Sequence, residues 1–377
     1  MTNVTIIIRQ PLERRPPIAT LLNCLCKMGY RIVLICTEVQ DKSKKQYEDN
    51  VNFKIITIPT YKLGIVNKII SWMMFRRKVF SFLKRNPEYY SKSILWIGSA
   101  DAALALGKKL FKFNYIFHCF ELYDAFPWYK RKLKKIMQNA KLNITPEDNR
   151  GAIFRSWYKL KETPITLPNK PFFHPQKRNL NIDNTIASQI IEKLKDKKII
   201  LYQGGIVKGR DVSQIAKAIE QIDDDWVLVL MGYTDRSRYL ADLLKQYPKT
   251  VYIPPVPAPY HLQITSWARI GIVSYAFDDL NHVFCAPNKT WEYTGFGIPM
   301  LGNNVPGIMN DLKKYGSGEF INLQNDDVNE IIDAINRIDF NYNSYSKNTL
   351  TFYNSVDIYQ IISHIIKEVD GKIAVSK

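Results

Sequence analysis

Short runs of β-branched and aromatic residues alternate with longer helical stretches along this chain. In the first half we predict strands at 4–8, 31–36, 53–58, 94–98, 115–118, 143–145 and 164–167, and helices at 17–28, 65–84, 101–110, 128–139 and 147–159. Strands that alternate with helices of this length form βαβ units, and such units build a parallel, doubly wound sheet. The pattern therefore predicts an α/β fold.

The alternation is interrupted at 169–188, where two prolines and an Asn-rich polar stretch indicate a linker. A second series follows, with strands predicted at 198–203, 226–231, 251–254, 270–275, 300–301 and 319–321, and with two closing helices near 328–338 and 355–369. We therefore expect a first α/β domain at 1–175, a second at 190–350, and a C-terminal segment at 351–377.

Composition limits the class of protein. The chain has 377 residues, of which 46% are hydrophobic, and this supplies enough core for two ordinary domains. It contains no run of 18 apolar residues, and the apolar residues at 4–8 are typical of a buried strand and not of a signal peptide. The five cysteines are odd in number and favour reduced core residues. These features predict a cytoplasmic protein.

The positive charge lies almost entirely in the first half. Residues 1–180 hold 33 Lys and Arg against 12 Asp and Glu, a net charge of +21, whereas residues 181–377 hold 20 against 23. A diphosphate ligand needs only two or three cations. The asymmetry therefore indicates a larger anionic partner for the first half, either a membrane surface or a nucleic acid.

The most informative motif is the segment 285–299, Cys-Ala-Pro-Asn-Lys-Thr-Trp-Glu-Tyr-Thr-Gly-Phe-Gly-Ile-Pro. Asn288 is a suitable N-cap for a helix, whose free N–H groups attract anions. Lys289 beside that end and Glu292 three residues later suit a diphosphate joined to a ribose. A capped surface helix with an ordinary Lys–Glu pair explains the same spacing.

This segment resembles the Pro-Asn-Lys-x-x-Glu-Tyr signature of GT-B glycosyltransferases of the family 4 type, as found in bacterial surface-polysaccharide synthesis. The stretches at 201–210 (Leu-Tyr-Gln-Gly-Gly-Ile-Val-Lys-Gly-Arg), 115–124, 144–150 and 167–171 are also similar to that family, in the same order. The resemblance implies two Rossmann-like domains with a central cleft and a C-terminal helix that crosses back to the first domain. It implies that Glu292 holds the ribose of a nucleotide-sugar donor.

The resemblance also assigns roles to the loops that follow the strands of the second half. Gly204 and Gly205 would let the diphosphate approach the backbone, and Arg210 would bind it, helped by Lys208. Without the resemblance, this segment is an ordinary βα turn. The remaining donor-side residues implied by the family are Gly232, Tyr233 and Ile253, which would pack against the donor and its base; they too could form ordinary turns.

Acceptor-side candidates lie in the first half. His118 closes a predicted strand three residues before Glu121, and a His–acid pair can hold a proton from an acceptor hydroxyl. A histidine at a strand end is more often structural. The loop after the first strand lacks the family's Gly-Gly, which suggests an acceptor phosphate contact through Arg14 or Arg15. Position 284, where many retaining members have an acid, is Phe284.

The predicted helix at 65–84 is both amphipathic and basic. Its positive charge comes mainly from Arg76, Arg77 and Lys78, and a second basic, aromatic cluster follows at 126–135. Such helices lie in anionic membrane interfaces. The alternative is an amphipathic crossover helix that packs on the sheet.

We therefore expect a cytoplasmic enzyme, peripheral at the inner membrane face. It would transfer a sugar, from a UDP-sugar by preference, to a glycan acceptor carried on a polyprenyl diphosphate. No cofactor is expected. A metal is not expected either, because the acid pairs at 223–225 and 278–279 are typical of solvated turns and no His partner is apparent nearby. The alternatives are a GT-B-type sugar-nucleotide epimerase and a basic nucleic-acid-binding protein, although no nucleic-acid-binding module is recognisable. The stereochemical outcome and the oligomeric state stay open.

Overall fold

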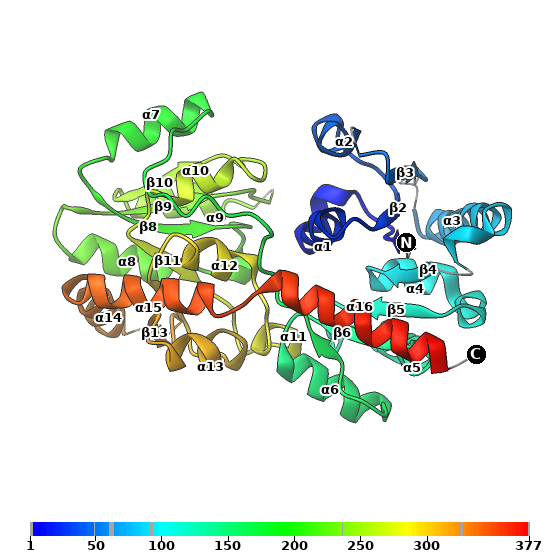
Figure 1. The fold of residues 1–377 in the computed structure, drawn as a ribbon. Helices are drawn as coiled ribbons and strands as arrows, with labels where there is room; N and C mark the ends of the chain where they lie inside the picture. The colour runs from blue at the N-terminus through cyan, green and yellow to red at the C-terminus, as the bar shows by residue number, and fades with distance from the viewer. Residues whose placement is uncertain are drawn as a thin grey trace. The chain divides into compact units, whose positions relative to one another are not determined.

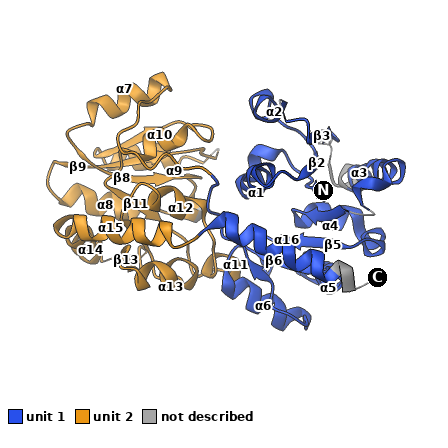
Figure 2. Ribbon diagram, in the orientation of Figure 1, with its two compact units in different colours: residues 1–172, 357–377 blue, residues 173–356 orange. Residues whose placement is uncertain are grey.

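The computed structural model describes residues 3–48, 50–59, 64–90, 93–235, 237–324 and 327–375, with the backbone alone at 64–68, 209 and 373–375. The chain divides into two compact units (Figure 2). Unit 1 comprises Met1–Phe172 together with Asp357–Lys377, and unit 2 comprises Phe173–Val356. The C-terminal segment therefore belongs to the first unit.

Unit 1 contains a seven-stranded parallel sheet in the order β3-β2-β1-β4-β5-β6-β7 (Figure 1). The central strands β1, β2 and β4 are nearly continuous runs of buried aliphatic side chains, as expected for a parallel sheet covered on both faces. The strands are β1 (Asn3–Ile7), β2 (Arg31–Cys36), β3 (Phe53–Thr57), β4 (Ser93–Ile97), β5 (Tyr115–His118), β6 (Leu142–Thr145) and β7 (Ile165–Thr166).

Helices and short 3-10 turns connect these strands. They are η1 (Leu12–Arg14), α1 (Pro16–Lys27), α2 (Asp41–Glu48), α3 (Gly64–Arg85), η2 (Pro87–Tyr89), α4 (Ala100–Leu106), η3 (Gly107–Lys112), α5 (Pro127–Asn139), α6 (Asp148–Tyr158) and, from the end of the chain, α16 (Ile358–Val375). Ile362, Ile365 and Ile366 of α16 join Leu21 and Leu25 of α1 in one core cluster. The last helix thus completes the core of the first unit.

Unit 2 contains a six-stranded parallel sheet in the order β10-β9-β8-β11-β12-β13. Its strands are β8 (Lys198–Gln203), β9 (Trp226–Met231), β10 (Thr250–Ile253), β11 (Ile270–Val273), β12 (Met300–Asn303) and β13 (Gly318–Ile321). Its helices are α7 (Thr185–Lys193), η4 (Lys208–Arg210), α8 (Ser213–Gln221), α9 (Tyr239–Gln246), α10 (His261–Thr265), α11 (Leu280–Val283), α12 (Asn288–Thr294), α13 (Pro306–Lys314), α14 (Val328–Phe340) and α15 (Tyr342–Asn354).

The strand order reverses between β8 and β11, which are hydrogen-bonded neighbours. In an open parallel sheet, ligands bind beyond the carboxyl ends of the strands at such a reversal. The binding position expected from topology in unit 2 therefore lies beyond Gln203 and Val273. The corresponding reversal in unit 1 lies between β1 and β4.

Three helices depart from the sequence-based expectation. Helix α7 begins at Thr185, inside the predicted linker, where the Asn184 side chain caps it by accepting from the Ala187 N–H at 2.9 Å. Helices α2 and α15 were not predicted, because most of their residues are polar and they show little apolar periodicity. Most other elements begin and end within two residues of the predicted bounds.

The predicted helix at 65–84 is α3, and residues 60–63 lie outside the described part of the chain. No helix in the described residues is long and apolar enough to cross a membrane.

Candidate active site

The candidate site begins where β8 ends in Gln203 and Gly204. Gly204 has φ 137°, which favours glycine, and its carbonyl oxygen occupies the place that a Cβ atom on Gly232 would take. Gly232, at the end of β9, has φ 150°. Glycine at both positions therefore lets two strand ends approach each other and leaves an open backbone surface beyond the sheet.

Two cationic side chains converge on this surface. A Cβ atom placed on Gly204 would lie 3.5 Å from Lys289 Nζ and 3.9 Å from an Arg210 guanidinium nitrogen. Lys289 is buried, and its Nζ has no hydrogen-bond partner within the described residues. Its ammonium lies 4.4 Å from the centre of the Tyr202 ring, and the Arg210 guanidinium lies 5.5 Å from that of Tyr275. The aromatic faces partly replace water around these charges.

Burial and the neighbouring charge of Arg210 lower the pKa of Lys289 to about 7. An ammonium group that has lost its water and faces another cation gains most from an anionic ligand. This corner of the site is therefore suited to a phosphate group, and a diphosphate could contact both cations.

A carboxylate lies at the other end of the same helix turn. Glu292 Oε1 lies 3.2 Å from His261 Nε2, and Glu292 Oε2 accepts a hydrogen bond from the Gln203 side chain. Burial opposes the ionisation of Glu292, but the charges of His261 and Lys289 and the hydrogen bond from His261 outweigh it and lower the pKa of this carboxyl group. Burial also disfavours a charge on His261, yet Glu292 raises the pKa of that imidazole. Glu292 is thus a fixed, ionised acceptor.

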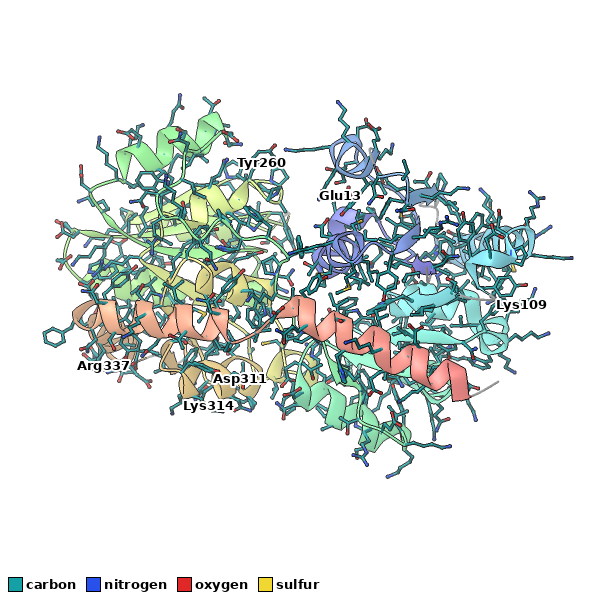
Figure 3. The ribbon with its side chains drawn as sticks, viewed as in Figure 1. Glu13, Lys109, Tyr260, Asp311, Lys314 and Arg337 are labelled. Carbon is teal, nitrogen blue, oxygen red and sulfur yellow. The ribbon has the colours of Figure 1, made fainter. Side chains whose placement is uncertain are left out.

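Most of these groups line one cavity of about 370 Å³, whereas Arg210 lies beside Gly204 and is not part of the lining. The predicted residues Gly204, Gly232, Tyr233, Asn288, Lys289 and Glu292 all belong to its lining, together with Gln203, Met231, Pro255, Val256, Ala258, His261, Tyr275 and Pro287. Figure 3 labels Tyr260, which directly precedes His261 and marks the start of α10 in the ribbon. Apolar, cationic and carboxylate groups therefore surround a space of the size that a nucleotide needs.

Some predicted donor residues lie elsewhere. Gly205 is covered by the Tyr233 ring, whose hydroxyl would be 2.9 Å from a Cβ atom there. Lys208 is exposed on η4 and is not part of the lining. The side chain of Ile253 lies in the core, and only its carbonyl reaches Gly232, 3.2 Å from the Gly232 nitrogen. The expected N-cap role of Asn288 is wrong, because α12 begins at Asn288 and its N-cap is Pro287, with no side-chain cap bond.

Sequence reasoning missed His261 and Gln203. Gln203 lies 58 residues before His261 and was noted only as the end of a strand. Both side chains reach Glu292 because β8 and α10 bring them to the same edge of the sheet. Gln203 lies within the motif at 201–210 but received no role there, and no local pattern in the sequence marks His261.

The acceptor-side candidates lie in unit 1. His118 is fully buried at the end of β5, with its ring centre 4.0 Å from that of Phe120, and neither ring nitrogen has a hydrogen-bond partner within the described residues. Burial, and secondarily the charge of Arg15, lower the pKa of His118 to about 3. His118 is therefore neutral at physiological pH and closed to solvent. Its role in catalysis stays a prediction.

Glu121 is paired with a cation from α6. Its carboxylate lies 3.3 Å from an Arg150 guanidinium nitrogen, and the same nitrogen donates to the Phe120 carbonyl. Arg15 places its guanidinium 5.2 Å from the centre of the Phe120 ring, whereas Arg14 is exposed. The structure therefore brings Arg15, His118 and Glu121 to one edge of the unit 1 sheet.

Glu13, which is labelled in Figure 3, lies in the same loop as Arg14 and Arg15. Its side chain accepts a hydrogen bond from the Gln40 N–H at 2.9 Å. This contact links the loop after β1 to the loop after β2. Both loops follow the carboxyl ends of parallel strands, where an α/β sheet presents its binding residues.

The acidic pair at 278–279 does have a histidine neighbour, contrary to the sequence-based expectation. His282 Nδ1 lies 2.6 Å from Asp278 Oδ1 and 3.7 Å from Asp279 Oδ1. The cause is local, since α11 places His282 one turn after the pair and the Asp279 side chain caps that helix. The three side chains therefore contact one another at this turn.

Comparison with known proteins supports the fold. No family model and no curated protein matches the sequence. Among solved structures, HepE from Anabaena, in complex with UDP and glucose, aligns over 98% of this chain and 100% of its own, with a TM-score of 0.72 and 11% identity. The glycosyltransferase WaaG, involved in lipopolysaccharide biosynthesis, aligns over 98% and 100% with a TM-score of 0.66 and 13% identity. An E. coli trehalose-6-phosphate structure bound with UDP-2-fluoro glucose aligns over 98% and 99%, with a TM-score of 0.69 and 13% identity.

Identities this low establish the fold alone. The two parallel sheets of units 1 and 2, together with these alignments over nearly the whole chain, show that the protein has the GT-B fold.

Proposed function

We propose that this protein is a glycosyltransferase that takes a sugar from a UDP-sugar donor bound in the unit 2 cavity. The observation that carries the proposal is the placement of Lys289 and Arg210 beside Gly204 and of Glu292 in the same cavity. The cations fit a diphosphate, and the ionised carboxylate fits the two ribose hydroxyls. The structural similarity to HepE and to the E. coli trehalose-6-phosphate structure, both bound to UDP compounds, supports UDP as the nucleotide.

The same residues can assist the reaction. Negative charge builds up on the diphosphate as its bond to the sugar breaks. Preorganised cations in a site that excludes water stabilise that charge more strongly in the transition state than in the bound donor. We infer that Arg210 and Lys289 supply this stabilisation without a metal, and that Glu292 contributes to donor binding and not to the chemical step.

Two substitutions test the donor site. Glu292→Ala should weaken UDP binding, and Arg210→Ala should mainly lower turnover. Hydrogen bonds to charged groups contribute roughly 1.5–3 kcal/mol, which corresponds to losses of about tenfold to a hundredfold. Titration calorimetry with UDP and a screen of sugar nucleotides for nucleotide release would measure both. Two folded variants with wild-type affinity and turnover would refute the assignment.

We further propose a lipid-linked glycan acceptor at the cytoplasmic face of a membrane, in a surface-polysaccharide pathway. The support is the +21 charge of the first half and the surface of α3. The inner face of α3 packs Phe75, Val79 and Leu83 into the unit. On the rest of the helix, four large apolar side chains are between 38% and 59% exposed, namely Ile69, Ile70, Met73 and Met74, and α5 adds exposed Trp128.

Cationic side chains accompany this apolar surface. Arg77 and Lys78 are exposed on α3, and the Trp72 ring stacks on that of Trp128 with their centres 5.8 Å apart. Arg76 is placed differently from the expectation, because its guanidinium donates to the Ala105 carbonyl at 2.6 Å and so lies against α4. Apolar, aromatic and basic side chains on one surface are typical of a helix that lies on an anionic bilayer.

Vesicle sedimentation tests this contact. Replacing Arg77 and Lys78 by Ser should release the protein from vesicles of anionic phospholipid, because each cation near such a surface contributes on the order of 1 kcal/mol. Lys313→Ser with Lys314→Ser in unit 2 is the matched control, since it removes the same charge from exposed positions on α13. Equal release by both double variants would indicate generic basicity.

The two alternatives predict different products and ligands. An epimerase would convert one sugar nucleotide into another without an acceptor, whereas a transferase releases UDP when the acceptor is added. A nucleic-acid-binding protein would bind single-stranded RNA in preference to anionic vesicles. Neither alternative explains both the cationic corner of the cavity and the exposed apolar surface of α3.

A further inference from the structure

Side chains from two elements, β8 and α10, hold the carboxylate of Glu292. His261 Nε2, from α10, lies 3.2 Å from one carboxylate oxygen, and Gln203, at the end of β8, donates to the other. The Thr265 hydroxyl donates to Gln203 Oε1 at 2.7 Å and so fixes which way that amide faces. Each carboxylate oxygen therefore already accepts one hydrogen bond from the protein.

A carboxylate can accept about two hydrogen bonds on each oxygen. Because Glu292 lines the cavity, the remaining acceptor positions are available to a ligand with two neighbouring hydroxyls. The orientation of these positions depends on the two protein donors, since the carboxylate would otherwise rotate about its last side-chain bond.

We propose that His261 is the positioning residue that makes this cavity select ribonucleotides, because its Nε2–H holds Glu292 in the orientation that receives both ribose hydroxyls. This inference rests on the proposed donor site and names what that site discriminates. His261 is suited to the role, because its other ring nitrogen, Nδ1, is buried without a hydrogen-bond partner in the described part of the chain. Within the described residues, the imidazole therefore makes its hydrogen bond through Nε2, to Glu292.

A role in packing alone makes a different prediction. If His261 only fills space, its replacement should weaken all nucleotides equally, and the preference for ribose should persist. If His261 orients Glu292, its replacement should remove that preference selectively. The informative quantity is therefore the ratio of the dissociation constants for 2′,3′-dideoxy-UDP, which lacks both hydroxyls, and for UDP.

Two amide substitutions form a matched pair. The Nε2 atom of glutamine lies as many bonds from Cα as the Nε2 atom of histidine, so His261→Gln keeps a donor for Glu292. The amide of His261→Asn is one bond shorter and cannot replace that donor. Titration calorimetry of the full chain with UDP and with 2′,3′-dideoxy-UDP would give the ratio for each protein.

We expect the wild type and His261→Gln to bind UDP at least about tenfold more tightly than the dideoxy compound, which is the effect of one hydrogen bond to a charged group. For His261→Asn the ratio should fall below about threefold, as it should for Glu292→Gln. A wild-type ratio in His261→Asn would overturn the inference. If His261→Asn does not fold, His261→Ala takes its place, and a wild-type ratio in that variant would overturn the inference equally.

The wild type separates this inference from the proposed function. Tight binding of UDP with a ratio near one would leave the donor site standing and would overturn the positioning role. No binding of UDP at all would overturn both.

Discussion

Lys289 should take up a proton when UDP binds. Its pKa is about 7 in the empty cavity, because it is buried beside Arg210. A diphosphate next to the ammonium group would replace the missing counter-charge and return the pKa toward the ordinary value near 10.5. The pKa of Lys289 is thus lower in the free protein than in the complex, so binding is favoured when the lysine can be protonated.

The magnitude follows from the pKa of about 7. At pH 8 the Lys289 amine is protonated in only about a tenth of the free protein, whereas it is almost fully protonated in the complex. Binding of one UDP should therefore take up about 0.9 proton. Between pH 7.5 and 9, the dissociation constant should rise by nearly tenfold per pH unit, which corresponds to about 1.4 kcal/mol. The ligand itself contributes little in this window, because the last phosphate pKa is near 6.

Titration calorimetry in two buffers of different ionisation enthalpy measures the uptake directly. Lys289→Arg is the matched control, since an arginine stays protonated and its binding of UDP should be nearly independent of pH in this window. His261 also has a shifted pKa, and uptake that persists in Lys289→Arg would identify that imidazole as its source. UDP binding by the wild type with no proton uptake at pH 8 would refute the account of Lys289.

Three further substitutions test the architecture. Gly232→Ala should abolish UDP binding and lower the thermal midpoint, because the new Cβ atom would meet the Gly204 carbonyl. Gly371→Ala is the control: its new Cβ atom meets nothing within 4 Å, so neither UDP binding nor the thermal midpoint should fall. His118→Leu should keep or raise the thermal midpoint, because it removes two buried ring nitrogens that have no hydrogen-bond partner in the described residues. UDP affinity should not change. A loss of sugar transfer in this variant would support the acceptor-side role of His118. Arg150→Met should lower the free energy of unfolding, measured in urea, by about 2–4 kcal/mol. The substitution removes the buried hydrogen bond to the Phe120 carbonyl and leaves Glu121 without its cation. Unchanged stability would contradict this account.

The sheets were predictable and several helices were not. The bounds of β2, β5, β8 and β9 agree with the prediction, because runs of buried β-branched residues between polar residues have few alternatives. Helix α2 buries only Tyr47, and α15 is rich in Asn, Ser and Tyr. Tertiary contacts stabilise these two helices more than their local sequence does, so neither periodicity nor propensity indicates them.

Some residues of the candidate site could likewise be predicted from the sequence, and others could not. Lys289 and Glu292 share one helix, and their spacing fits both a ligand site and an ordinary surface Lys–Glu pair. The resemblance of the motif favours the ligand site, and both residues line the cavity. Gln203 and His261 reach Glu292 only because strand order places their elements together. A histidine in a short helix carries no local signal of such a contact. Sequence therefore identifies the groups that would contact the donor more readily than those that orient them.

The distribution of charge assigns the proposed donor site and the proposed membrane contact to different cations. Two cations converge beside Gly204, Lys289 from the cavity lining and Arg210 from outside it, and each lies against a tyrosine ring. The +21 of the first half comes entirely from other residues, among them the exposed Arg77 and Lys78 next to the apolar surface of α3. Buried cations of the first kind are weakly screened by salt, whereas exposed ones are screened within about 10 Å at 0.1 M. Raising the ionic strength should therefore release the protein from anionic vesicles well before it weakens UDP binding, if the proposed membrane contact and the proposed donor site use separate residues.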